Sequence, residues 1–137
     1  MQFAPDKDFT TYTIRAHQTG QIKVMSPVTA SGDFTGQLSE LILTRSFIIS
    51  PKKLVDDWPP KHLQELTQLH IQAVLDLNPE LVILGTGQLL EFPPPSLTEA
   101  MLTQGIGIEI MDTRAACRTY NVLMHEGRHV VAALIME

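Results

Sequence analysis

One stretch decides the fold of this chain: residues 81–87, which read Leu-Val-Ile-Leu-Gly-Thr-Gly. Its first four residues are apolar with no polar alternation, as in a strand that is covered on both faces. Glycine, threonine and glycine follow directly, where the chain has to leave the strand and turn. Strands covered on both faces are typical of parallel sheets that carry helices on each side. We therefore predict an α/β fold built around this strand.

Helix patterns lie on both sides of the strand. Before it, apolar residues recur at helical spacing on one stripe: Leu63, Leu66, Leu69 and Ala73. Asn78-Pro79 should end that helix, because proline cannot continue it. After the strand, Ser96 and Glu99 have the spacing of a capping box at a helix start, and Gly105 is placed to end this second helix.

The rest of the second half adds two strands and a helix. Residues 106–110 alternate with isoleucine as in a strand, and residues 130–135 form a closing apolar strand. Between them, Asp112-Thr113 opens a helix that runs to about Glu126, with Gly127 following its last turn. The order is therefore α-β-α-β-α-β, and strands joined in this way usually run parallel with right-handed crossovers.

The first half reads as β structure. Polar and apolar residues alternate over residues 11–16 and 21–24, and compact apolar runs follow at 41–43 and 47–49. The last two runs flank Thr44-Arg45-Ser46 and look like a hairpin. Turn residues gather at two further positions: Ser31-Gly32-Asp33 and Gly36. We predict one domain over residues 1–137, with a mixed β-sheet, flanking helices and antiparallel strands from the first half.

Composition excludes several classes of function. Ten Lys and Arg against fifteen Asp and Glu give a net charge of -5, which argues against a nucleic-acid partner because phosphates attract cationic surfaces. One cysteine cannot form an internal disulfide. The longest apolar run, residues 130–136, is far below the ~20 residues of a membrane span. We expect a soluble, cytoplasmic protein, and antiparallel edge strands leave a homodimer open.

Two predicted strands end at candidate binding segments. Gly85-Thr86-Gly87 follows one strand, and Asp112-Thr113-Arg114 follows another. Ligands in open α/β sheets bind beyond the carboxyl ends of the strands, so these segments share one edge if the strands are neighbours. Consecutive amides around Gly85 and Gly87 can form an anion-binding nest, and the helix start near Thr113 adds further free amides.

Two arginines extend this candidate anion site. Arg114 lies in the first helical turn, where a cation opposes the helix dipole, and Arg118 lies on the same helical face. A bound anion or a nearby acidic group such as Asp112 would relieve that conflict. The simpler interpretation is that both arginines are solvated and the glycines merely let the chain turn, because Gly-x-Gly alone lacks the rest of any nucleotide-binding motif.

No pattern of residues in the sequence matches a catalytic motif. Cys117 lies between the two arginines, which favour a thiolate, but the helical wheel places it beside the buried stripe, so we expect a packed and inert thiol. Tyr120-Asn121 can bond across the sheet edge, although simple packing of the ring is preferred. His62 and His70 are expected on the surface of one helix. With no tight cluster of metal-ligating residues, we expect no metal, no cofactor and no catalytic residue.

Four segments of the C-terminal half resemble one family. They are residues 81–87, 105–113 (Gly-Ile-Gly-Ile-Glu-Ile-Met-Asp-Thr), 116–123 (Ala-Cys-Arg-Thr-Tyr-Asn-Val-Leu) and 126–128 (Glu-Gly-Arg). Trp58 and Phe34-Thr35-Gly36 fit the same family more loosely. The family is the Mth-domain family, which includes mitochondrial complex I assembly factor three and the adipogenesis-associated Mth-domain protein.

The resemblance implies an α/β fold of mixed sheet and flanking helices, with no established catalytic residues. It also implies a role in assembling respiratory membrane complexes through protein partners, and we expect a bacterial, cytoplasmic member. Two functional hypotheses follow. The first is a non-enzymatic interaction or assembly protein. The second is a small-molecule, nucleotide or anion-binding protein, possibly an enzyme, that uses the strand ends at 85–87 and 112–114.

Overall fold

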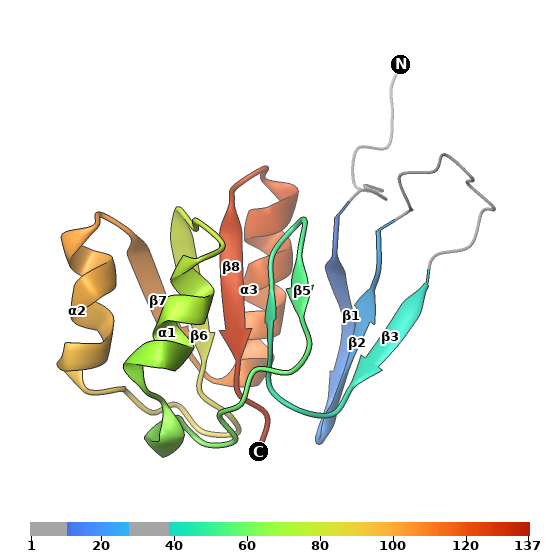
Figure 1. Cartoon of the computed structure of the whole chain (residues 1–137). Coiled ribbons are helices and arrows are strands. Elements are labelled where there is room, and N and C mark those ends of the chain that lie inside the picture. Colours follow the sequence, from blue (N-terminus) through green and yellow to red (C-terminus); the bar gives the residue numbers. More distant parts are fainter. Residues whose placement is uncertain (1–10, 28–38) are drawn as a thin grey trace.

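The computed structural model describes residues 11–27 and 39–137 and arranges their strands in two sheets (Figure 1). An antiparallel sheet has the order β1-β2-β3, and a mixed sheet has the order β5-β4-β8-β6-β7. The α/β fold class is confirmed, but the strands that we expected in one mixed sheet are divided between two. The turns predicted at Ser31-Gly32-Asp33 and Gly36, and the segment Phe34-Thr35-Gly36, lie outside the described residues.

The elements follow one another in the order of the chain. The strands of the antiparallel sheet are β1 (Thr13–Gln18), β2 (Gln21–Met25) and β3 (Glu40–Leu43). Those of the mixed sheet are β4 (Phe47–Ile49), β5 (Leu54–Val55), β6 (Leu81–Gly85), β7 (Gly107–Met111) and β8 (Val130–Leu134). The helices are the short 3-10 turn η1 (Leu63–Glu65), α1 (Gln68–Leu75), α2 (Pro95–Thr103) and α3 (Thr113–His125).

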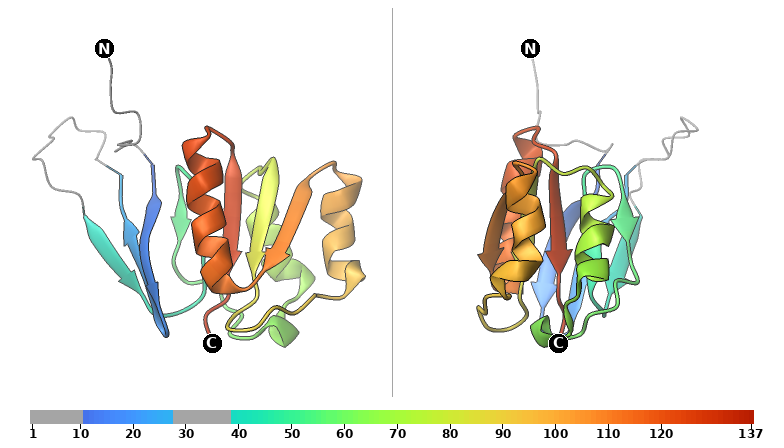
Figure 2. Two further views of the ribbon diagram at one scale, coloured as in Figure 1. Left: turned by 180° about the vertical axis from the view of Figure 1, so that it is seen from behind. Right: turned by 60° about the vertical axis from the view of Figure 1, so that its left-hand side comes forward.

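The mixed sheet is buried on both faces. β6 runs parallel to β7 and β8, whereas β4 runs antiparallel to β8. Val82 and Leu84 pack with α1 and α2, while Leu81 and Ile83 pack with α3 and the antiparallel sheet. Figures 1 and 2 show α1 and α3 on opposite sides of this sheet. The apolar run that decided the fold is therefore a central strand, as predicted.

The predicted hairpin between residues 41–43 and 47–49 is wrong. β3 pairs with β2, and β4 pairs with β5 and β8, so the two strands belong to different sheets. Their surroundings differ accordingly, because β3 alternates between half-buried and exposed residues whereas β4 is fully buried. Between them the buried Ser46 accepts a hydrogen bond at Oγ from the amide of Met136, 2.9 Å away.

The helix predicted from Leu63 begins later than expected. Leu63 and Leu66 are buried, but they belong to or follow η1, and α1 begins at Gln68. In α1 the buried residues are Ile71, Val74 and Leu75, whereas Leu69 is 81% exposed, so the predicted stripe was only partly right. His62 precedes η1 while His70 lies in α1, so the expectation that they share one helix is wrong.

The capping box predicted at Ser96 and Glu99 is also wrong. α2 begins at Pro95, so its N-cap is Pro94, two residues before the predicted Ser96, and it makes no side-chain hydrogen bond. Proline suits the first helical position because its fixed φ matches the helix and its missing N–H would have no helical partner there. Ser96 therefore lies inside the first turn. In this part of the chain, the prolines and not the serine set the start of the helix.

Two side chains of α3 join it to the edge strand β1. Asn121 accepts a hydrogen bond from the amide of Ile14 (3.0 Å) and donates one to the carbonyl of the same residue (2.6 Å). The buried Tyr120 donates its hydroxyl to the carbonyl oxygen of Tyr12 at 2.8 Å. Burial raises the pKa of the Tyr120 hydroxyl, so it remains a donor. Both packing and hydrogen bonding therefore hold these two residues in place.

Cys117 lies in the core between α3 and the two sheets. Desolvation raises the pKa of its thiol from 9.0 to about 12, although the neighbouring Arg118 partly opposes this shift. A thiol with this pKa stays protonated near neutral pH and is a poor nucleophile. The expectation of a packed and inert cysteine is confirmed. None of the helices in the described ranges is long and apolar enough to cross a membrane.

We predict that Asn121→Leu lowers the free energy of unfolding by about 2 kcal/mol, because it leaves the N–H and C=O of Ile14 without their partner. Urea unfolding followed by circular dichroism measures this change. Gln18→Leu is the matched control, because it makes the same kind of change at an exposed position of β1 and should shift stability by less than about 0.5 kcal/mol. Equal effects of the two variants would contradict the proposed role of Asn121.

Cys117 should also make stability depend on alkaline pH. The unfolded thiol loses its proton near pH 9.0, whereas the folded thiol keeps it to about 12, so its contribution is complete below pH 9.0 and declines above it. Urea unfolding at increasing pH should therefore show a steeper loss of stability in the wild type than in Cys117→Ala. Parallel profiles, or native thiol labelling as fast as that of the unfolded chain, would contradict the burial of this group.

Candidate functional site

The ends of β6 and β7 lie side by side at one edge of the mixed sheet. The two strands are parallel neighbours, with Gly85 opposite Met111. Beyond them, the amide of Thr86 donates to the carbonyl of Met111, and the amide of Thr113 donates to the carbonyl of Gly87, both at 2.9 Å. The predicted juxtaposition of residues 85–87 with residues 112–114 is confirmed. Arg118 follows one turn later on α3.

The hydroxyl of Thr113 links three strand ends. Its Oγ1 accepts a hydrogen bond from the amide of Gly87 at 2.8 Å and donates one to the carbonyl oxygen of Ile135 at 2.7 Å. The amide of Ile135 in turn donates to the carbonyl of Gly85 at 3.0 Å. Thr113 is buried, so these bonds lie out of competition with water. The segments after β6, β7 and β8 are thereby fixed relative to one another.

Close packing explains one of these glycines, and backbone conformation explains the other. A Cβ on Gly85 would lie 2.9 Å from a methyl carbon of Leu134 and 3.0 Å from the Cα of Thr113. Gly87 has a φ of +102°, and a Cβ there would lie 2.6 Å from the carboxyl group of Glu137. Distances below 3.0 Å cannot be accommodated without movement of the neighbouring atoms. Gly85 is therefore required by the close approach of Leu134 and Thr113, and Gly87 by its positive φ, because the carboxyl group of Glu137 is the end of a flexible side chain that can move.

The amides of the expected anion nest already have partners within the protein. In addition to the bonds of Thr86 and Gly87, the amide of Gln88 donates to Oε1 of Glu137 at 3.0 Å. At the start of α3, the amide of Ala115 donates to Oδ1 of Asp112 at 2.9 Å. Asp112 is thus the N-cap of α3, and the carboxylate of Glu137 lies against the loop. A ligand at this edge would have to be bound mainly by side chains.

Thr86 shapes the loop that follows β6. It is fully buried, and its Oγ1 donates to the carbonyl of Leu89 at 2.6 Å and accepts from the amide of Glu91 at 3.2 Å. The hydroxyl is therefore committed to the backbone of residues 89–91. Of the residues predicted for an anion site, Thr86 is directed into its own loop, whereas Arg114 and Arg118 are exposed on α3.

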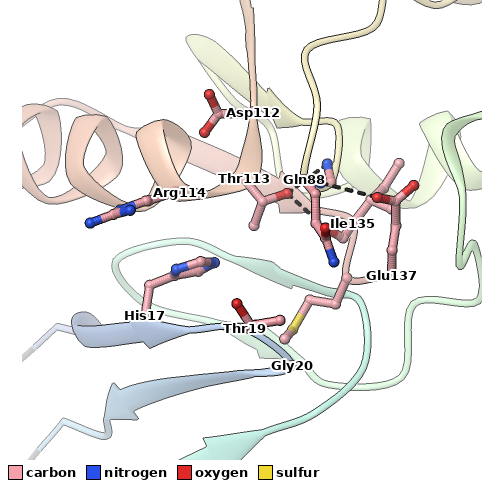
Figure 3. Close-up of a pocket in the computed structure, with 11 residues that line it drawn as sticks. His17, Thr19, Gly20, Gln88, Asp112, Thr113, Arg114, Ile135 and Glu137 are labelled. Carbon is pink, nitrogen blue, oxygen red and sulfur yellow. Dashed lines mark hydrogen bonds between the residues drawn. The ribbon is translucent and has the colours of Figure 1, made fainter.

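A cavity of about 310 Å³ lies beside the strand ends (Figure 3). Its walls come from the β1–β2 turn, the loop after β6, the start of α3 and the segment after β8. The lining residues with polar or charged side chains are His17, Thr19, Gln88, Asp112, Thr113, Arg114 and Glu137. Arg114 is the residue of the predicted set that brings a cation to this cavity.

A second hollow of about 210 Å³ adjoins the first between β1 and α3. The two hollows share His17 and Arg114. The second one adds Arg15 from β1 and Arg118 and Asn121 from α3, with the buried Cys117 in its lining. We call the two hollows together the β1–α3 groove, defined by Arg15, His17, Arg114 and Arg118.

Little in the sequence indicated the β1 side of this groove. His17, Thr19 and Gly20 belong to the first quarter of the chain, and Glu137 follows the last strand. The strands predicted at 11–16 and 21–24 do imply a turn at Gly20, which lies between them. Nothing in the local pattern indicated that this turn packs near residues 87 and 114. The position of this turn depends on the packing of the antiparallel sheet against α3, and no sequence pattern indicated that packing.

The described side chains of the groove are suited to the recognition of charge. Within the described ranges, no group of three or more His, Cys, Asp and Glu residues is arranged to hold a metal ion. Cys117 is protonated and buried, and Asp112 is committed to capping α3. What remains exposed is a set of cationic and hydrogen-bonding side chains on a rigid frame.

Comparison with known proteins places this architecture in a family. Residues 28–135 match the family described as "Protein of unknown function (DUF498/DUF598)". The "13 kDa major membrane protein" of Francisella tularensis is 30% identical over 95 residues, covering 69% of this chain and 73% of that protein. The mouse NADH dehydrogenase [ubiquinone] 1 alpha subcomplex assembly factor 3 is 38% identical over 90 residues, covering 64% of this chain. The chain spans about half the length of that assembly factor (48%).

Solved structures share the fold over nearly the whole chain. A crystal structure of a protein from Bordetella parapertussis has 31% identity and a TM-score of 0.77, covering 93% of this chain and 98% of that one. An NMR structure from Xanthomonas campestris has 41% identity and a TM-score of 0.73, covering 98% and 89%. A Bordetella pertussis solution structure described as a Mth938-like domain has 24% identity, a TM-score of 0.72 and coverage of 98% and 90%, and it supports the fold alone.

These matches agree with the resemblance seen in the C-terminal half, where the strand β6, the strand β7 and the helix α3 carry the shared segments. The family match also extends that resemblance into the first half of the chain. On this evidence the chain belongs to the DUF498/DUF598 family.

Proposed function

We propose that this protein is a non-enzymatic interaction module that acts in the assembly of protein complexes. The observation that carries the proposal is an exposed apolar loop after β6. Leu89, Leu90 and Phe92 are 72%, 52% and 70% exposed, respectively. Large apolar side chains gathered at the surface favour contact with another protein, because their burial in an interface removes apolar area from water.

The loop that carries these side chains is held in place from both sides. Thr86 fixes its start through the backbone of residues 89–91. Gln64 donates its side-chain amide to the carboxylate of Glu91 at 2.8 Å, and Gln68 donates to the carbonyl of Ser96 at 2.8 Å. A loop that is already ordered loses less conformational entropy on binding, so its apolar side chains contribute more to affinity.

The neighbouring helix adds a further apolar side chain. Leu69 is 81% exposed and directly follows Gln68, whose side chain bonds the segment beyond the loop. We define the apolar patch as Leu69, Leu89, Leu90 and Phe92. Its members come from α1 and from the loop after β6, and the hydrogen bond of Gln64 to Glu91 connects η1, which precedes α1, with that loop.

The relatives support a role in assembly and suggest its finer form. Several are named as assembly factor 3 of the NADH dehydrogenase 1 alpha subcomplex, in mouse, cattle and human. We propose the same kind of role for this chain, as a bacterial, cytoplasmic protein whose protein partners belong to a respiratory membrane complex. The Francisella relative is named a membrane protein, which is consistent with work at a membrane-bound partner. The alternative is that the same apolar patch binds a second copy of this chain and forms a homodimer.

We predict that Leu89→Ser combined with Phe92→Ser lowers recovery of specific partners by about tenfold, because it removes two exposed apolar contacts. The measurement is quantitative mass spectrometry after affinity purification of the tagged protein from cells that express it natively, with membranes included. The thermal midpoint of the double variant should match that of the wild type, since both side chains are exposed.

Val122→Ser is the matched control, because Val122 is 58% exposed on α3, away from the loop. It should leave partner recovery unchanged. Recovery of no partner above background by the wild type, or equal recovery by the double variant, would count against the proposal. Sedimentation of the purified wild type separates the homodimer from binding of a different protein.

A further inference from the structure

Three arginines and a histidine lie on the two facing walls of the β1–α3 groove. Arg15 and His17 come from β1, and Arg114 and Arg118 come from α3. The chain contains five arginines and carries a net charge of -5, yet three of those arginines line this one groove. Such a concentration of positive charge on an acidic protein favours an anionic ligand at this place.

The arginines of α3 have no partner in the described part of the chain. Neither Arg114 nor Arg118 makes a hydrogen bond or an ion pair with residues 11–27 or 39–137. Arg15 makes only a loose ion pair, with its Nε 3.9 Å from Oε2 of Glu40. Exposed pairs at this distance contribute little, so Arg15 is also available. The groove therefore presents guanidinium groups whose donors are free for a ligand.

The position of these arginines on α3 opposes their own helix. Arg114 lies in the first turn, where the positive end of the helix dipole repels a cation. Arg118 lies four residues further along the same face, so the two like charges also repel each other. A bound anion would offset both repulsions at once.

Two carboxylates line the larger hollow together with Arg114, and each already accepts a hydrogen bond from a backbone amide. Asp112 accepts a hydrogen bond from the amide of Ala115 and caps α3. Glu137 bonds the amide of Gln88 and lies 3.4 Å from His62. In Figure 3, Glu137 lies at the end of the cavity opposite to Arg114. Arg114 therefore lies at the end of the cavity away from Glu137, on the side shared with the second hollow.

The size and rigidity of the groove suit a small ligand. Its hollows measure about 310 and 210 Å³ and share His17 and Arg114; the larger one lies at the lower end of the range for small-molecule sites, and the smaller one lies below that range. The hydrogen bonds from Asn121 to Ile14 fix the separation of its walls. The register of β1 against β2 shifts between Ile14 and Ala16, so Arg15 lies at an irregularity of the strand, a feature common next to binding sites.

We infer that the β1–α3 groove binds a small anion carrying two or more negative charges, held by Arg114 and Arg118 with Arg15 and His17 facing them. Guanidinium groups bind phosphate and carboxylate groups through paired hydrogen bonds. The shared chemistry thus includes phosphorylated metabolites and polycarboxylates. The inference is independent of the apolar patch and holds whether or not that patch binds a protein.

Isothermal titration with inorganic pyrophosphate and with citrate, at constant ionic strength, tests this site. We expect saturable binding of at least one probe to one site. Arg114→Gln and Arg118→Gln should each weaken the binding by about tenfold or more. Arg128→Gln is the matched control: it removes the same charge at an exposed position beyond α3 and should change affinity by less than about twofold.

The outcomes separate the sources of the anion. Tighter binding of pyrophosphate indicates a phosphorylated ligand, and tighter binding of citrate indicates a polycarboxylate. Misfolding is checked by thermal unfolding without ligand, where Arg114→Gln should be at least as stable as the wild type because it removes a charge opposed to the helix dipole. The inference is overturned if neither probe saturates by about 10 mM. Equal weakening by Arg128→Gln, or binding of a polyglutamate peptide without either small anion, also overturns it.

Discussion

The segments that follow β6, β7 and β8 approach one another closely, and the rest of the structure depends on this constraint. The buried hydroxyl of Thr113 bonds the loop after β6 and the segment after β8, and Gly85 leaves the space in which Leu134 and Thr113 pack. Because three segments converge on one hydroxyl, the directions in which the chain leaves β6 and β7 are both fixed. The apolar patch begins on the first of these paths, and the arginines of α3 lie on the second.

This arrangement separates two kinds of recognition. The loop after β6 is shaped by Thr86 and presents apolar side chains, whereas α3 presents guanidinium groups toward β1. Burial of apolar area gives affinity with little directional preference, while paired hydrogen bonds to an anion select for charge and shape. Both surfaces rest on one rigid frame, so the protein does not have to rearrange to present either of them.

The sequence predicted the second half of the fold well and the first half poorly, for a physical reason. β6, β7, α3 and β8 are marked by local patterns, and their parallel pairing follows from the helices between them. The strands with which β3 and β4 pair are decided by packing between distant segments. The local pattern of residues 41–49 does not indicate this packing. For the candidate site, the neighbouring strand ends were predictable, but Gly85 and Gly87 suit an anion nest and close packing equally well. The contribution of His17 to the groove depends on where a whole sheet docks.

The contact between Asn121 and Ile14 has a consequence for self-association. β1 is an outer strand, and the open backbone groups of an outer strand are a template on which another chain can add a strand and start a fibril. At Ile14 a side-chain amide occupies both of these groups, so α3 takes the place of a fourth strand. Asn121 thus opposes aggregation by strand addition along this side of the sheet.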